Sequence, residues 1–162
     1  MTNTSNVIDE FASYIDWLNT LSRLDESMWE KSIATDKWSI KTIVLHIAHW
    51  DNHLLNVIIP AVKNGEGMIF PEFDSFNARA TQKAKRLSGE NVLQLAKKSR
   101  SSLVEALRSL RQETLTSHTT ANGVTHCPHQ GVPYTLTYIV TEFIGHDRHH
   151  QQQVDAILGR TS

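Results

Sequence analysis

Apolar residues recur at helical spacing along almost the whole chain, and this periodicity restricts the fold to the all-α class. Residues 6–28, 40–63, 73–113 and 133–158 each carry apolar side chains at steps of three and four, the period of an α-helix. No stretch shows the alternation that is typical of a half-buried strand. Helices with one apolar stripe bury it against one another. The sequence therefore predicts one domain over residues 1–162, an antiparallel four-helix bundle with a long loop before its last helix.

Capping and breaking residues set the expected helix ends. Ser39 is placed to cap the second helix, and Pro60 is expected to end or kink that helix near its last turn. The run Ser-Gly-Glu at 88–90 is expected to split the third stretch into two segments. Pro133 suits the first turn of the last helix, and Gly159 suits its C-terminal stop.

Two regions of the chain are assigned to the surface. The charged residues in the second segment of the third stretch are expected to be largely solvated: Lys97, Lys98, Arg100, Arg108 and Arg111. Residues 114–132 are rich in Thr, His, Gly and Pro and predict a long loop. Within it, the run His-Cys-Pro-His at 126–129 offers thiol and imidazole donors. Three interpretations of this run stay open: a separate metal site, a lid over an active site, and a disordered connection.

Charge and composition argue against several classes of partner. The formal net charge is −1, from 16 basic and 17 acidic residues without a charge block, so neither nucleic acid nor an anionic membrane surface is expected as a partner. No apolar run approaches the roughly 20 residues that span a bilayer, and the N-terminus lacks the features of a secretory signal. Cys127 is the only cysteine, so no internal disulfide can form. We therefore expect a cytoplasmic protein that acts on a small molecule.

The nine histidines depart most clearly from an ordinary composition, and they are clustered. Three lie within residues 46–53, three within 118–129 and three within 146–150. On a helical wheel of the last helix, His150 points almost along the centre of the apolar stripe and His146 lies about 65° from it. His149 points well away. Two imidazoles one turn apart are thus predicted on the buried face of an otherwise apolar helix.

The second helix offers a third inward imidazole. His46 lies at the edge of its apolar stripe, roughly 90° from the centre, whereas His53 and then His49 lie progressively farther toward solvent. Burying an imidazole without a partner costs about 1–3 kcal/mol, and a metal ion removes that penalty. Three histidines with an open position are typical of catalytic sites for zinc, nickel or iron. The alternatives are a hydrogen-bonded core pair for His146 and His150, and an interface histidine capped by a carbonyl for His46.

The segments that carry these histidines resemble motifs of the DinB-like superfamily. Residues 38–51 (WSIKTIVLHIAHWD) resemble its W-S-x-K-x-x-x-x-H segment, and residues 145–153 (GHDRHHQQQ) resemble its H-x-x-x-H-x-x-Q segment. Residues 73–78 (FDSFNA) resemble a D-x-F-N stretch of some members. By motif order and helix lengths, the resemblance covers nearly the whole chain.

The resemblance implies an up-down-down-up bundle, often a homodimer, with a divalent metal held by His46, His146 and His150. These are the same three residues that the helical wheels select. Family members with known activity include metal-dependent transferases that use low-molecular-weight thiols, a mycothiol-dependent isomerase and a hydrolase-like resistance protein. The resemblance thus implies a low-molecular-weight thiol as a cosubstrate, so Cys127 is not needed as the nucleophile.

The leading functional hypothesis is a metal-dependent enzyme, an S-transferase or a hydrolase, that activates a thiol or water toward a small electrophile. Three neutral histidines leave the full charge of the metal, which favours thiolate or hydroxide. Glu142, one turn before His146, is a candidate acceptor for a ligand N–H. Asp51 and Asp147 are candidates to orient a ligand or to face a partner subunit. The alternatives are a protein that binds or sequesters a metal or small ligand without turnover, and a dimer braced by the metal.

Overall fold

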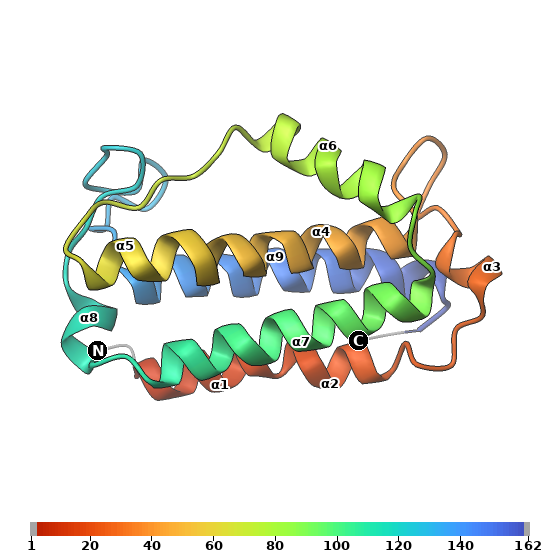
Figure 1. The fold of residues 1–162 in the computed structure, drawn as a ribbon, viewed down its shortest axis with the longest axis horizontal. Helices are drawn as coiled ribbons and strands as arrows, with labels where there is room; N and C mark the ends of the chain where they lie inside the picture. The colour runs from red at the N-terminus through yellow and green to blue at the C-terminus, as the bar shows by residue number, and fades with distance from the viewer. Residues whose placement is uncertain (1–2, 161–162) are drawn as a thin grey trace.

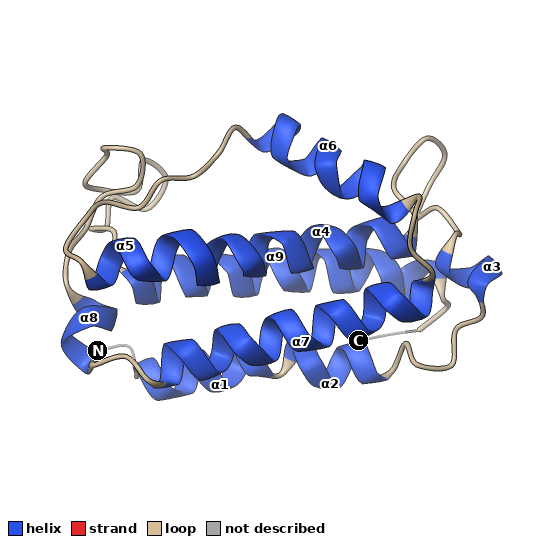
Figure 2. Ribbon diagram, in the orientation of Figure 1, coloured by secondary structure: helices blue, strands red, loops and turns tan. Residues whose placement is uncertain are grey.

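Helices account for all the regular secondary structure in residues 3–160, the part of the chain that the computed structural model describes (Figures 1 and 2). The elements are α1 (Thr4–Ala12), α2 (Tyr14–Asn19), α3 (Glu26–Trp29), α4 (Ile40–His53), the π-helical turn η1 (Leu54–Ile58), α5 (Ile59–Lys63), α6 (Phe73–Ala84), α7 (Gly89–Arg108), α8 (Gln112–Thr116) and α9 (Leu136–Ile157). Strand-like pairing in this part is limited to isolated β-bridges. The predicted all-α class is confirmed.

Four helical rods form the bundle: α1–α2, α4–η1–α5, α7 and α9 (Figure 1). The colours of Figure 1 show α1–α2 and α9 running one way, and α4–α5 and α7 running the other. Side-chain pairs agree, because Glu10 contacts Arg148 whereas Trp17, farther along, donates to Asp155, also farther along α9. The order is up-down-down-up. No helix in residues 3–160 is long and apolar enough to cross a membrane.

Side-chain caps fix the starts of the helices that carry the site. Ser39 accepts a hydrogen bond from the backbone of Thr42 and begins α4, as predicted. The last helix begins at Leu136, because Thr135 caps it by accepting from the backbone of Tyr138. The prediction that Pro133 opens this helix is wrong. Its backbone instead bridges to His126 within the preceding loop.

The helix does not stop at Pro60. Proline cannot donate a backbone hydrogen bond, which should interrupt the ladder of an α-helix. Here the π-helical turn η1 precedes it, closed by a bond from the Ile59 N–H to the Leu54 carbonyl, and α5 carries the rod on to Lys63. A π-turn inserts one extra residue, so the rod continues past the missing donor.

The third helical stretch is split at Ser88, as expected, but only its second part enters the bundle. Ser88 caps α7, while α6 lies outside the bundle and across α4 (Figure 1). Asn77 and Phe76 hold α6 there: the indole N–H of Trp50 donates to Asn77 Oδ1 at 3.1 Å, and the Phe76 ring packs against the same indole at a tilted angle. In this position α6 forms one wall of the candidate site.

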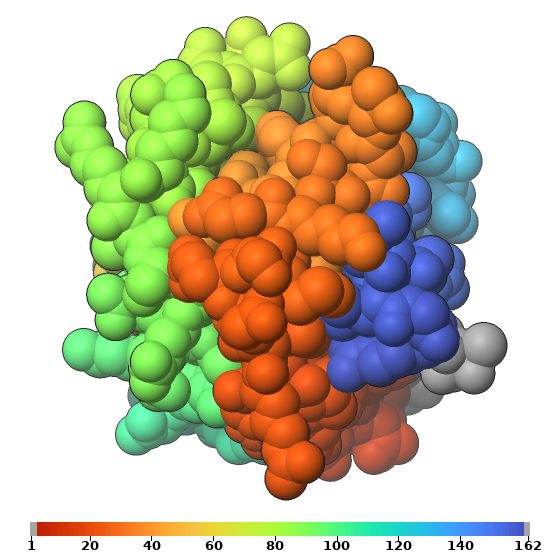
Figure 3. All heavy atoms as spheres, turned by 90° about the vertical axis from the view of Figure 1, so that its right-hand side faces the viewer, coloured from red at the N-terminus to blue at the C-terminus, as the bar shows by residue number. Residues whose placement is uncertain are grey.

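The interior contains two apolar clusters, one toward each end of the bundle. One is centred on Phe11, Leu103 and Val140, and the other on Tyr14, Ile43 and Val154. Seen end-on in Figure 3, the orange segment between α2 and α4 packs between the start of α7 (green) and the end of α9 (blue) and closes the second cluster. A layer of buried charged residues, Asp51, Arg100 and Asp147, separates the two clusters.

Candidate metal centre

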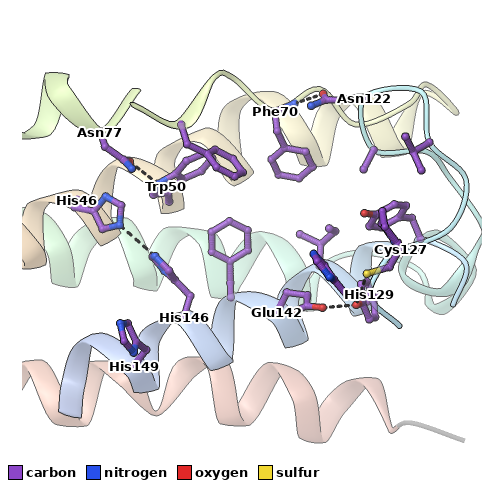
Figure 4. A pocket seen from close by; sticks show the side chains of 18 of the residues that line it. His46, Trp50, Phe70, Asn77, Asn122, Cys127, His129, Glu142, His146 and His149 are labelled. Carbon is purple, nitrogen blue, oxygen red and sulfur yellow. Dashed lines mark hydrogen bonds between the residues drawn. The ribbon is translucent and has the colours of Figure 1, made fainter. Parts of the chain in front are cut away.

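Three histidines from two antiparallel helices meet beside this buried layer. His46 lies on α4, and His146 and His150 lie one turn apart on α9. The Nε2 atom of His146 is 3.2 Å from Nε2 of His46 (Figure 4). It is also 3.2 Å from Nε2 of His150. One nitrogen from each ring lies within 4.8 Å of the other two. The structure thus brings together the three residues selected from the sequence.

The donor set fits a divalent cation. Metal–nitrogen bonds of 2.0–2.1 Å at tetrahedral angles place two ligand nitrogens about 3.3 Å apart, close to the two contacts observed. Hydrogen bonding alone does not satisfy the cluster, because one proton on His146 Nε2 serves only one of its two neighbours. His150 Nδ1 lies 2.7 Å from Gln153 Oε1, an acceptor that places the proton on Nδ1 and the lone pair on Nε2. The three nitrogens therefore form a set of converging ligand atoms.

Burial keeps these rings neutral. It lowers the pKa of His46 to about 3, with a further contribution from the neighbouring His146 and His150. Burial and the charge of His150 lower the pKa of His146 to about 4, and burial also lowers the pKa of His150. Neutral imidazole is the form that binds metals. At neutral pH the site needs no deprotonation before it binds an ion.

The histidines form one end of a cavity of about 860 Å³. Figure 4 shows His46 and His146 at that end, Trp50 beside them, and Cys127 and His129 at the other. Seven aromatic side chains line the cavity, from α4 and the turn before it, from α6 and the segment before it, from the loop before α9, and from α9: Trp38, Trp50, Phe70, Phe73, Tyr134, Tyr138 and Phe143. A pocket with apolar walls and a few placed polar groups is typical of small-molecule sites.

A comparison of the sequence with protein-family models places the chain in a family. The model of the DinB superfamily matches residues 13–154. The chain belongs to the DinB superfamily. No curated protein matches this DinB-superfamily chain by sequence.

Two solved structures share the fold of this DinB-superfamily protein. YfiT from Bacillus subtilis, described as a probable metal-dependent hydrolase with an unusual four-helix bundle topology, aligns with a TM-score of 0.73 at 13% identity, over 98% of this chain and 89% of YfiT. A mycothiol-dependent maleylpyruvate isomerase aligns with a TM-score of 0.74 at 13% identity, over 94% of this chain. The chain spans 61% of the isomerase. At these identities the likeness shows the fold alone.

The loop before α9 is an ordered wall of the site in this DinB-superfamily protein. Cys127 and His129 line the cavity, and backbone bonds such as Cys127 N–H to the Val132 carbonyl, 2.9 Å, hold the loop together. The interpretation as a disordered connection is therefore wrong. Among residues 3–160, His46, His146 and His150 form the only cluster of metal-ligating groups, so the loop does not form a second one.

Glu142 does not contact the histidines. It accepts a hydrogen bond from the hydroxyl of Tyr138, which also lies 3.1 Å from Sγ of Cys127. The nearby Tyr138 hydroxyl lowers the pKa of the Cys127 thiol. The prediction that Glu142 accepts a hydrogen bond from a ligand histidine is therefore wrong. Glu142 instead places its carboxylate in the far half of the cavity.

The assignment of the other helical histidines to solvent holds only for His149, which is exposed. His49 and His53 are half-buried because α6 and the segment before it cover them. His53 Nε2 lies 2.8 Å from the Ile69 carbonyl, and the ring of His49 packs against Phe76. A helical wheel of α4 alone carries no information on a helix that docks from outside the bundle.

The prediction that Arg100 is solvated is wrong. Its side chain is fully buried and forms ion pairs with Asp51 and Asp147. Burial raises the pKa of Asp147 to about 6 and also raises that of Asp51, although the guanidinium opposes both shifts. Both carboxylates are buried and bonded to Arg100, so in the part of the chain that the structure describes neither contacts a ligand histidine and neither lies at the surface, where a partner subunit would bind. Sequence spacing carried a signal, because Arg100 follows the buried Ala96 by four residues and precedes the buried Leu103 by three.

Proposed function

We propose that this protein is a metal-dependent enzyme that activates a thiol or water for transfer to, or hydrolysis of, a small electrophilic molecule. The observation that carries the proposal is the convergence of three neutral imidazole nitrogens at the wall of an 860 Å³ cavity. A divalent cation held there by His46, His146 and His150 would lower the pKa of a thiol or water and polarise the substrate. Zinc, nickel and iron all suit three imidazole ligands.

The cavity supports a catalytic rather than a structural role for this site. Three protein ligands leave a coordination position free, which is the pattern of catalytic sites, whereas structural sites are closed by a fourth protein ligand. The cluster in residues 3–160 has three members and adjoins the cavity. The aromatic walls would bind the apolar body of a substrate and exclude water from the reacting groups.

The lining of the cavity indicates the kind of substrate. Among the residues that line it, Glu142 is the only carboxylate, and neither lysine nor arginine is present. A polyanion such as a nucleotide would find no fixed cationic side chain there. We propose a small, largely apolar electrophile as the substrate.

A low-molecular-weight thiol is the proposed cosubstrate. The mycothiol dependence of one structural neighbour supports a thiol, and the hydrolase description of YfiT supports water as the competing nucleophile. In the thiol reaction, the sulfur of the cosubstrate would form a bond to the electrophilic carbon while the bond from that carbon to the leaving group breaks, and the thiol proton would pass to solvent or to the leaving group. The homodimeric state and the cytoplasmic location stay predictions.

His46→Ala tests the proposal. Protein purified without an affinity tag should contain stoichiometric metal by elemental analysis and should form product with a panel of thiols and electrophiles. The variant should lose both metal and turnover while its far-UV circular dichroism stays that of a helical bundle. His126→Ala is the matched control, because His126 is exposed and lies outside the cluster.

The same experiment separates the proposal from its alternatives. Unchanged metal content in His46→Ala would contradict the assignment of the ligands. Stoichiometric metal without product from any nucleophile would instead favour a protein that captures a ligand without turnover.

A further inference from the structure

The Arg100 side chain uses all five of its N–H donors inside the protein. Nε and Nη2 donate to the two oxygens of Asp51, Nη1 and Nη2 donate to the two oxygens of Asp147, and Nη1 also donates to the Phe11 carbonyl. The donor–acceptor distances run from 2.8 to 3.0 Å. The rings of Phe11 and Tyr14 lie 3.8 and 4.3 Å from the guanidinium carbon. No donor of this guanidinium is left for another partner.

These bonds join all four rods of the bundle at one level. Arg100 extends from α7, Asp51 belongs to α4, Asp147 belongs to α9, and the Phe11 carbonyl belongs to α1. Asp147 directly follows the ligand candidate His146, and the Asp51 bonds hold α4 about one turn beyond His46. The level of Arg100 is therefore next to the level of the histidines.

The helices that carry the histidines need such a connection. α4 packs mainly on α7, and α9 packs mainly on α1, whereas α4 and α9 touch one another little. His46 and His146 nevertheless place their Nε2 atoms 3.2 Å apart, although the helices that carry them have little direct packing to hold that distance. Apolar packing is non-directional and does not by itself set this register. The two bidentate pairs of Arg100 do set it, because each fixes both distance and angle.

We propose that Arg100 is a positioning residue that presets the metal centre by holding α4 and α9 in the register at which the histidine nitrogens converge. The inference rests on the proposed metal centre and adds to it the device that keeps the ligands together before an ion binds. Lysine cannot reproduce the arrangement, since an ammonium has three donors and no planar fork. We predict that Arg100→Lys separates the histidine nitrogens and weakens metal binding more than an equally destabilising substitution elsewhere in the core.

The experiment compares four metal-free proteins: the unmodified chain, Arg100→Lys, Arg108→Lys and Leu107→Ala. Arg108 lies on the same helix and pairs with Asp9 at the surface, so it controls for an arginine-to-lysine change. Leu107 is buried on α7 away from the charged layer, so Leu107→Ala lowers stability without touching the network. Crystal structures report the Nε2 separation, and titration with Co²⁺, whose visible absorption reports coordination, gives the affinity.

Arg100→Lys should lengthen the contact between His46 and His146 in the metal-free crystal and weaken Co²⁺ binding at least tenfold, with an altered Co²⁺ spectrum. Both controls should keep the contact and the spectrum. The inference is overturned if Arg100→Lys keeps the contact, or if Leu107→Ala weakens Co²⁺ binding as much.

Should Arg100→Lys not fold, Asp51→Asn, which keeps the arginine and its Asp147 pair, must lengthen the contact instead. Failure of the unmodified chain to bind Co²⁺ would reject the metal centre, whereas the crystal contact tests the positioning by itself.

Discussion

At the scale of single residues, the three histidines differ in the hydrogen-bond partner of their second ring nitrogen, Nδ1. His150 has an acceptor for its second nitrogen, Gln153 Oε1 at 2.7 Å. Nδ1 of His46 and Nδ1 of His146 are buried without a hydrogen-bond partner in the described structure. An acceptor behind a ligand imidazole fixes its tautomer and raises its basicity. His150 is therefore the ring whose lone pair is oriented most firmly.

This difference predicts the effect of Gln153→Leu. Without the acceptor, the His150 ring can take the other tautomer, and metal affinity should fall about 10- to 100-fold, the range found for such partners. Gln152→Leu is the control, because Gln152 is the exposed neighbour on the same helix. A chelator competition assay measures both affinities. Equal affinities for the two variants would show that Gln153 does not orient the ligand.

The sequence predicted the inward histidines because each lies within one regular helix. Helical geometry alone distinguishes His150 from His149, and the structure agrees. The same reasoning misses Arg100, because a charged helical side chain is almost always solvated unless it is paired. A fully buried arginine becomes plausible only when its partners are known, and Asp51 and Asp147 lie 49 and 47 residues away. Such a pairing is a property of the folded bundle.

At the scale of helices, the sequence predicted the four rods of the bundle but not the walls of the cavity. Periodicity and the cap Ser39 locate rods, since both are local signals. The docking of α6 across α4 depends on Asn77 meeting Trp50, and the loop wall depends on backbone bonds such as that from Met68 N–H to the Thr120 carbonyl. These contacts join separate segments, so no local pattern reveals them.

Two helical glycines give an opposed pair of predictions at this scale. A Cβ atom at Gly89, the first residue of α7, would lie 2.0 Å from the ring of Trp29, which is 2% exposed. Gly89→Ala should therefore destabilise the fold by about 1–3 kcal/mol, the usual cost of overpacking. A Cβ atom at Gly145 in α9 would meet nothing within 4 Å. Gly145→Ala should stabilise by about 0.5–1 kcal/mol, since alanine favours a helix.

Urea unfolding of the two metal-free variants measures both changes. The expected result is a lower midpoint for Gly89→Ala and a higher one for Gly145→Ala, with the slopes unchanged. A Gly89→Ala protein as stable as the unmodified chain would mean that Trp29 does not pack on the start of α7. That outcome would leave the polar contacts of Glu26, with the Gly89 N–H and with Lys41, to fix α3 to the bundle.

At the scale of the whole molecule, the bundle does not depend on a metal for its core. Two apolar clusters and the Arg100 layer hold the four rods together, whereas small metal-dependent domains lack a core of this size. A cation should therefore add stability to a chain that is already folded. The gain follows mass action, about 2.7 kcal/mol at a free metal concentration of 100 times Kd.

Thermal unfolding makes this coupling measurable. For a chain of 162 residues, each kcal/mol raises Tm by roughly 2–4 °C, so saturating metal should raise Tm by about 5–10 °C and a chelator should reverse the rise. His46→Ala should melt as a helical bundle whose Tm does not respond to metal. An equal rise in that variant would place the ion elsewhere, whereas a chain that is unfolded without metal would contradict a prebuilt site. A stable metal-free bundle whose Tm rises with metal only when His46 is present is the one result consistent with ligands positioned in advance by the fold.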